Sequence, residues 1–170
     1  MVELFESGRG AVISGCARYR YLLTREVGGR GAGRVLFVML NPSTADGDVD
    51  DATVRGCVAR ARAWGYGELW VVNLFGLRST DPRALLLAAD AVGPENDVWI
   101  ERAARGSACV IAAWGVLGWI QGRDRLVLGM LEGIVGRDRI ECLGLTKGGA
   151  PRHPLYVPRT CGRDRFEWVG

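Results

Sequence analysis

The chain has little of what metal sites and disulfide frameworks are built from. Its five cysteines are odd in number, and none of them belongs to a C-x-x-C pair. This spacing gives no indication of a disulfide framework, a zinc site or an iron–sulfur cluster. His153 is the only histidine, so aspartates would remain as the main ligands, and these suit at best magnesium. We therefore expect no metal and no cofactor.

Long apolar runs are also missing. No stretch reaches the roughly 18 apolar residues of a membrane-spanning helix, and the opening MVELFESGRG has acids where a signal peptide has basic and apolar residues. We expect a cytoplasmic protein without membrane association. With 170 residues, 48% of them hydrophobic and 24% charged, the sequence predicts one folded α/β domain over residues 1–170.

Lysine is almost absent, since Lys147 is the only one, and arginine therefore supplies most of the positive charge behind the net charge of +3. Arginine suits bidentate contacts with phosphate, which favours an anionic partner. A GC-rich genome would produce the same bias, and the two explanations carry equal weight.

The N-terminal part predicts a β-hairpin at about residues 10–25, with strands at 11–14 and 19–24 around a Gly-Cys turn. The glycine run GGRGAGR at 28–34 follows it. A dinucleotide-binding loop needs its glycines after a strand and at the start of a helix. Here the glycines precede a strand, so we reject that function for them.

Strands and helices alternate in the remainder of the chain, and a loop-rich tail covers about residues 144–170. Parallel strands need long crossovers, so this alternation predicts a central four-stranded parallel sheet with helices on both faces, a three-layer α/β sandwich beside the hairpin. The predicted strands lie at 35–40, 69–72, 108–113 and 139–143, and the predicted helices at 51–64, 83–89, 95–104 and 116–134.

Polar segments follow all four predicted strands. They read NPSTADGDVDD, NLFGLRSTDP, WGVLG and GLTKGGAPRHPLY. In parallel sheets ligands bind beyond the carboxyl ends of the strands, so these segments should converge on one site. Any one of them alone is equally well explained as a turn, a helix cap or core. His153 is held between Pro151 and Pro154, whose fixed φ angles restrict the loop, and it is the only imidazole available for chemistry.

Several stretches resemble the bacterial and phage family known as domain of unknown function 1643. They cover about residues 19–158 and read YRYLLTR, VLFVMLNPSTAD, DATVRGCVARARAWGYGELWVVNLFGLRSTDP, GPENDVWI, VIAAWG and LGLTKGGAPRHPLYVP. The family name carries no activity.

More distantly, the order of motifs resembles the uracil-DNA glycosylase superfamily. That superfamily has a strand ending in Asn-Pro or Asp-Pro, a second ending in Asn, a third ending in Trp-Gly and a late His-Pro loop. The matching positions here are Asn41-Pro42, Asn73, Trp114-Gly115 and His153-Pro154. The resemblance implies a uracil-DNA glycosylase-like fold and an N-glycosidase activity on a nucleic acid or nucleotide.

The resemblance also implies roles for individual residues. Asn41 would position water against the anomeric carbon, on a turn stiffened by Pro42 and continued by Ser43 and Thr44. Asn73 would bind the edge of the base, and His153 would donate to a base carbonyl as negative charge develops there. Phe75 or Trp114 would stack on a flipped base.

Four aspartates follow Asn41, at positions 46, 48, 50 and 51. One of them would accept a proton from the attacking water or stabilise an oxocarbenium-like sugar, and we place Asp46 in that role. Asp50 or Asp51 is also suited to cap the next helix. Phosphate contacts would come from cationic or helix-start residues, namely Thr53, Arg55, Arg78, Lys147 and Arg152.

The sequence departs from the superfamily pattern at three places. Met39 replaces a glycine, Ser43 stands where an aromatic residue is common, and Leu155-Tyr156 follows the His-Pro pair in place of small residues. These departures count against duplex-DNA binding and uracil excision. Two alternatives stay open: a non-catalytic module that binds a nucleotide or modified base, and a protein-interaction domain.

Overall fold

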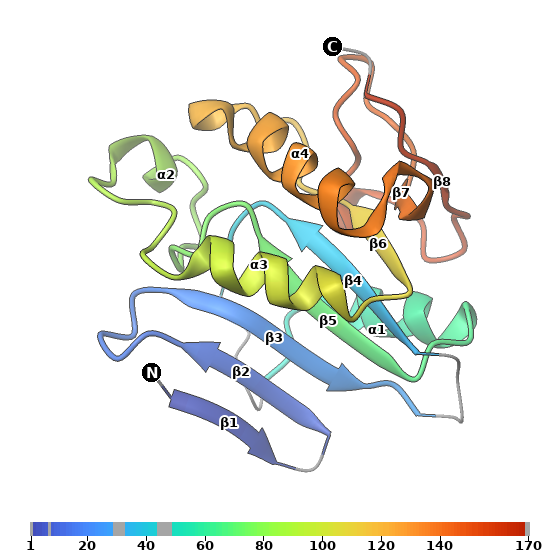
Figure 1. Cartoon of the computed structure of the whole chain (residues 1–170), viewed down its shortest axis with the longest axis horizontal. Coiled ribbons are helices and arrows are strands. Elements are labelled where there is room, and N and C mark those ends of the chain that lie inside the picture. Colours follow the sequence, from blue (N-terminus) through green and yellow to red (C-terminus); the bar gives the residue numbers. More distant parts are fainter. Residues whose placement is uncertain (1, 7, 29–32, 44–48, 169–170) are drawn as a thin grey trace.

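The computed structural model describes residues 2–6, 8–28, 33–43 and 49–168. In this part of the chain eight strands form one mixed sheet in the order β1-β2-β3-β5-β4-β6-β7-β8 (Figure 1). The strands are β1 (Val2–Glu6), β2 (Arg9–Ile13), β3 (Arg20–Glu26), β4 (Arg34–Met39), β5 (Glu68–Asn73), β6 (Cys109–Ala112), β7 (Ile140–Cys142) and β8 (Asp164–Arg165).

The centre of the sheet is the predicted group of four parallel strands. β4 pairs in parallel with both β5 and β6, and β6 pairs in parallel with β7. The residues of β4 from 35 to 39 are all buried, which is typical of a strand covered on both faces. The carboxyl ends of these strands therefore share one edge of the sheet, as the sequence predicts.

The sheet is larger than the sequence predicts, because the N-terminal hairpin belongs to it. β2 and β3 form the expected antiparallel pair, and β3 also pairs antiparallel with β5. The strand β1 extends the sheet beyond β2. Because β3 runs against β5, its first residue, Arg20, lies at the same edge as the carboxyl ends of the parallel strands.

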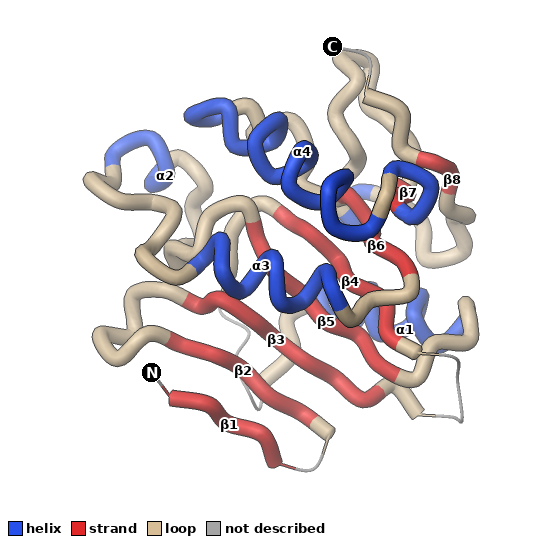
Figure 2. Tube along the Cα trace, in the orientation of Figure 1, coloured by secondary structure: helices blue, strands red, loops and turns tan. Residues whose placement is uncertain are grey.

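Helices cover both faces of the sheet (Figures 1 and 2). One face packs under α1 (Ala52–Ala63), through a buried cluster that includes Phe37, Val54 and Val71. The other packs under α3 (Asn96–Arg105) and α4 (Arg123–Val135), through a cluster that includes Leu36 and Val127. The side chains of β4 alternate between these two clusters, since successive residues of a strand point to opposite faces.

Two predicted helices differ from the structure. The segment 83–89 forms a single turn, α2 (Ala84–Leu87), with no side-chain cap. The helix predicted from residue 116 begins at Arg123, after turns and the short 3-10 helix η1 (Ile120–Gly122). A Cβ at Gly118 would lie only 2.2 Å from Cδ1 of Trp114, and Gly122 has a φ of +66°. These two glycines therefore allow a tight turn where the sequence predicts a helix.

The C-terminal tail is mostly loop, as predicted, but it contains two short elements that the sequence does not reveal. They are the 3-10 helix η3 (Pro154–Tyr156) and the strand β8, which pairs antiparallel with β7. A further 3-10 turn, η2 (Arg137–Arg139), leads into β7. Among the described residues, every helix is too short or too polar to span a bilayer.

Candidate functional site

A cavity of about 750 Å³ opens at the edge where the parallel strands end. Its volume lies within the range of small-molecule sites in proteins. The wall combines the end of β4, the start of α1, the segment 79–82, the turn after β6 and the loop around His153. Its described lining is Arg20, Met39, Leu40, Asn41, Ser43, Asp51, Ala52, Thr53, Val54, Ser79, Thr80, Pro82, Trp114, Gly115, Val116, Leu117, Thr146, Arg152, His153, Leu155 and Tyr156.

Asn41 leaves β4 with its side-chain amide held in one orientation. Its Nδ2 donates to the backbone oxygens of Ser79, at 2.9 Å, and Pro42, at 3.1 Å. Both partners are acceptors, so the amide nitrogen must face them. No described residue donates a hydrogen bond to Asn41 Oδ1, so this oxygen can accept one from a bound molecule.

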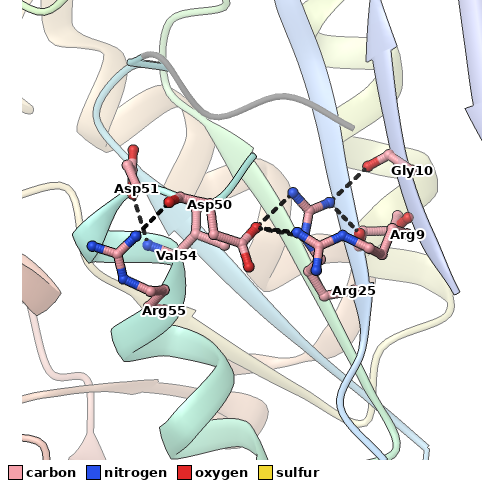
Figure 3. Close-up of polar contacts among 8 residues, drawn as sticks. Arg9, Gly10, Arg25, Asp50, Asp51, Val54 and Arg55 are labelled. Carbon is pink, nitrogen blue, oxygen red and sulfur yellow. Dashed lines mark hydrogen bonds and ion pairs between the residues drawn. The ribbon is translucent and has the colours of Figure 1, made fainter. Parts of the chain in front are cut away.

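Asp51 is the N-cap of α1 and also lines the cavity. Its Oδ1 accepts a hydrogen bond from the backbone N–H of Val54 at 2.8 Å. The preceding Asp50 points the other way. Its Oδ1 lies 2.7 Å from both Nε and Nη2 of Arg25, which is buried, and 3.0 Å from Nη2 of Arg9 (Figure 3). These two arginines on β2 and β3 therefore anchor the backbone that presents Asp51.

His153 caps η3 through its imidazole. Its Nδ1 accepts a hydrogen bond from the backbone N–H of Leu155 at 3.3 Å, so the neutral ring carries its proton on Nε2. Burial lowers the pKa of His153 to about 4, and the carboxylate of Asp51 opposes this shift. At neutral pH His153 is therefore an uncharged hydrogen-bond donor in the wall of the cavity.

Two contacts hold the His153 loop in place. The backbone N–H of Gly115, after β6, donates to the carbonyl of Pro151 at 2.9 Å. On the other side Arg60 of α1, which is 1% exposed, donates from Nη2 to the carbonyls of Val157, at 2.6 Å, and Pro158, at 3.0 Å. Arg60 thus joins α1 to the loop. In the sequence alone, Arg60 cannot be distinguished from a solvent-exposed arginine on a helix.

The structure brings together six of the residues given a role from sequence. The cavity is lined by Asn41, Ser43, Thr53, Trp114, Arg152 and His153. Trp114 is 1% exposed, and its ring packs edge-on against Phe166 with ring centroids 5.7 Å apart. It therefore serves the core as well as the cavity wall.

Other predicted residues lie elsewhere. Pro42 and Phe75 are buried, Arg78 is partly buried and Lys147 is exposed, and none of these four is part of the described lining. Thr44, Asp46 and Asp48 lie outside the described residues.

Asn73 is a special case among the predicted residues. It is 1% exposed, and both polar atoms of its amide are buried without a hydrogen-bond partner in the described part of the chain. It pairs in register with Met39, which forms part of the cavity wall. A buried amide without partners costs free energy, and this one lies one strand away from the site.

Sequence reasoning missed one charged residue of the wall and left another as one of four candidate aspartates. Arg20, 2% exposed, brings a positive charge from the first residue of β3. Asp51, considered only as one of several acids, is the described aspartate that lines the cavity. The antiparallel direction of β3 is the signal that could have located Arg20, because it puts the start of that strand at the functional edge.

The described residues contain no group of three or more histidine, cysteine, aspartate or glutamate side chains arranged to hold a metal ion. The cavity instead offers amide, carboxylate, imidazole and guanidinium groups among apolar side chains. Such a set can bind a polar organic molecule, hold its orientation and move or stabilise charge on it.

Comparisons with known proteins give one match. No curated protein and no solved structure matches the chain significantly. The family model described as "Protein of unknown function (DUF1643)" matches residues 20–155. The match starts at the first residue of β3 and ends within η3, so it contains the whole parallel core and nearly all of the cavity wall. The chain therefore belongs to the DUF1643 family.

Proposed function

We propose that the cavity binds a nucleotide unit and hydrolyses or recognises its N-glycosidic bond. One observation carries the proposal: Asn41, Asp51 and a neutral His153, which come from three separate segments, line the same cavity of about 750 Å³. Cleavage of this bond needs a group that orients water, a group that stabilises positive charge on the sugar and a donor to the leaving base. The three side chains supply these groups.

In this proposal each residue acts on a different part of the reaction. The Oδ1 of Asn41 accepts a hydrogen bond from the attacking water. The carboxylate of Asp51 stabilises the oxocarbenium-like sugar and takes the proton of that water as the carbon–oxygen bond forms. The electron pair of the broken carbon–nitrogen bond moves to the base, where the Nε2–H of His153 donates to the oxygen that becomes negative.

The remaining wall suits the phosphate and the base. Arg152 lies exposed at the wall, so it can contact a phosphate, and the buried Arg20 adds a positive charge to the wall. Asn73 is covered and does not line the cavity, so His153, rather than Asn73, holds the base edge in this proposal.

The order of strand-end motifs supports the same reading. Asn41-Pro42 follows β4, Trp114-Gly115 follows β6 and His153-Pro154 lies at the start of η3, and this order of motifs is the feature in which the sequence resembles the uracil-DNA glycosylases. Met39 remains in the wall where that superfamily has glycine, so we propose a different base or a different nucleic acid as the substrate.

The test is a base-release assay. The protein is incubated with nucleosides, nucleotides and oligonucleotides that contain normal and modified bases, and free base is followed by mass spectrometry. We expect one member of the panel to release base, and His153→Asn and Asp51→Asn to abolish release. Asp138→Asn, an exposed aspartate paired with Arg165, is the matched control and should retain it. Release that is unchanged in the first two variants would overturn the proposal.

A non-catalytic nucleotide-binding module is the second candidate. It is favoured by the hydrogen bond that Asp51 Oδ1 accepts as the N-cap of α1, because only the other carboxylate oxygen can then take part in a reaction. This reading predicts no base release, a raised melting temperature with one ligand of the panel, and loss of that shift in His153→Asn.

A further inference from the structure

A second hollow lies beside the cavity. It has a volume of about 350 Å³ and shares Gly115 and Val116 with the cavity, so these two residues form the ridge between the two spaces. We call this hollow the side pocket. Its other described lining includes Trp119, Asp124, Arg125, Gly148 and Trp168.

The side pocket carries two indole rings. Trp119 is 61% exposed, although a side chain of this size is usually covered. Trp168 is partly buried, and the guanidinium of Arg125 lies over its ring at 5.9 Å from the centroid. This contact joins the segment after β8 to the first turn of α4. The exposed ring of Trp119 is a surface on which a flat base can stack.

Trp119 sits on a stiff turn. Within this turn the backbone N–H of Gly122 donates to the carbonyl of Trp119 at 2.8 Å, and the N–H of Asp124 donates to the carbonyl of Gly118 at 3.0 Å. Gly118 also lies against the ring of Trp114, with no room for a Cβ. The backbone that carries Trp119 is therefore ordered before any ligand arrives, which lowers the entropy cost of binding at this position.

The charges around the ridge separate a place for phosphate from a place for a base. Arg152 lines the cavity and Arg125 lines the side pocket, while Lys147 is exposed between Thr146 of the cavity and Gly148 of the side pocket. These cations suit a phosphate that crosses the ridge. Asp124, in the side pocket, accepts a hydrogen bond from the backbone N–H of Arg125 at 2.8 Å. Its carboxylate would repel a phosphate but would accept a further hydrogen bond from the amino group of a base.

We propose that the side pocket binds the base of the nucleotide next to the one in the cavity, so that the ligand is a single-stranded nucleic acid. This inference rests on the proposed function of the cavity. Two neighbouring bases that enter separate hollows on either side of a ridge cannot stay stacked on each other or paired with a second strand. A single strand, whose bases are free to splay apart, fits this arrangement and a duplex does not.

Binding of end-labelled oligonucleotides tests the inference. Mixed-sequence single-stranded DNA and RNA, the same DNA as a duplex, and mononucleotides as competitors are titrated by fluorescence anisotropy. We expect single strands to bind more tightly than the duplex or mononucleotides. Trp119→Ala should weaken single-strand binding about 5- to 30-fold, and Trp119→Phe should restore most of it, because base–aromatic stacking needs only a ring. Leu126→Ala, an exposed α4 residue outside both hollows, should change nothing.

The outcomes separate this inference from the proposed function. Binding of mononucleotides that depends on His153 supports the cavity proposal. The side-pocket proposal fails if single strands then bind no more tightly than mononucleotides, or if Trp119→Ala binds as well as Leu126→Ala. If duplex DNA binds as tightly as single strands, the single-strand inference is wrong. If no nucleotide of any length binds, both proposals fail.

Discussion

At the scale of the residue, burial sets the protonation state of His153. Its pKa is about 4 in the folded protein, whereas an unperturbed imidazole titrates near 6.5. Between these values the unfolded chain binds a proton that the folded protein does not bind. The free energy of unfolding therefore falls as pH drops from about 6.5 to about 4, and this contribution levels off below that point.

We predict that His153→Asn removes this part of the acid sensitivity. Asparagine is a good N-cap residue, so it can still accept from the N–H of Leu155, but it does not titrate. Denaturation in urea at a series of pH values should show the wild type losing up to about 3 kcal/mol more than the variant between about pH 7 and pH 4. Parallel curves for the two proteins would mean that His153 titrates normally in the folded state.

Asp51 combines two roles that a pair of substitutions can separate. Asparagine keeps the hydrogen bond to the N–H of Val54 and removes the charge, whereas alanine removes both. We predict that Asp51→Asn changes the free energy of unfolding by less than about 0.5 kcal/mol, and that Asp51→Ala lowers it by about 1 kcal/mol. Both should lower base release by about 100-fold or more, if release is found. Equal loss of stability in the two variants would show that the charge, and not the cap, stabilises α1.

The acids also show where sequence reasoning stops at this scale. A cluster of aspartates after a strand end indicates that carboxylates gather near the site, but not which one faces the cavity. That choice depends on the backbone path into α1, where Asp50 turns toward Arg25 and Asp51 toward the cavity. The catalytic role given to Asp46 stays a prediction, because that residue lies outside the described part of the chain.

At the scale of the element, α1 and η3 are joined by one buried side chain. Arg60 donates to backbone carbonyls at the start of η3 and just after it, and also, from Nη1, to the carbonyl of Gly56 at 3.2 Å. In the described part of the chain its hydrogen-bond partners are all backbone carbonyls and no carboxylate pairs with it, so its role is to satisfy carbonyls and to fix the loop that carries His153. Arg60 is a positioning residue, because it touches the loop and does not line the cavity.

We predict that Arg60→Met lowers the free energy of unfolding by about 2 to 4 kcal/mol, because it leaves buried carbonyls without donors. It should also raise the pKa of His153 toward its ordinary value, since a loosened loop exposes the ring to water. NMR titration can follow this, because the chain has a single histidine. Arg62→Met is the matched control on the same helix: it loses a bond to the carbonyl of Val27 but should leave the pKa of His153 unchanged.

Elements with a strong apolar pattern could be predicted from the sequence, and elements set by tertiary contacts could not. The strands β4, β5, β6 and β7 appear within two residues of their predicted bounds, because each is a short apolar run between turns. β8 is two exposed residues long and exists only through its pairing with β7. The late start of α4 depends on the packing of Trp114 against Gly118, a contact that no local pattern contains.

At the scale of the whole molecule, the N-terminal hairpin and the α/β core meet at one ionic cluster. Asp50, just before α1, contacts Arg25 of β3 and Arg9 of β2 (Figure 3). The side chain of Arg25 is 2% exposed. Arg25 also donates to the carbonyl of Thr24 at 2.7 Å. The hairpin, which extends the sheet beyond the parallel core, is in this way connected to the segment that presents Asp51 to the cavity.

Removal of Asp50 tests whether this connection matters for the fold as a whole. Asp50→Ala leaves the buried charge of Arg25 with one anionic partner fewer. Because breaking a buried ion pair is costly, we predict that the free energy of unfolding falls by about 2 to 3 kcal/mol. Asp138→Ala removes an ion pair with Arg165 whose aspartate is 84% exposed, and it should cost less than about 0.5 kcal/mol. Hydrogen exchange should show that Asp50→Ala speeds opening of β2, β3 and the first turn of α1 together, while β6 and β7 stay protected. Uniform acceleration across the sheet, or a loss no larger than that of Asp138→Ala, would mean that the hairpin and α1 are held by apolar packing and that the cluster adds nothing to it.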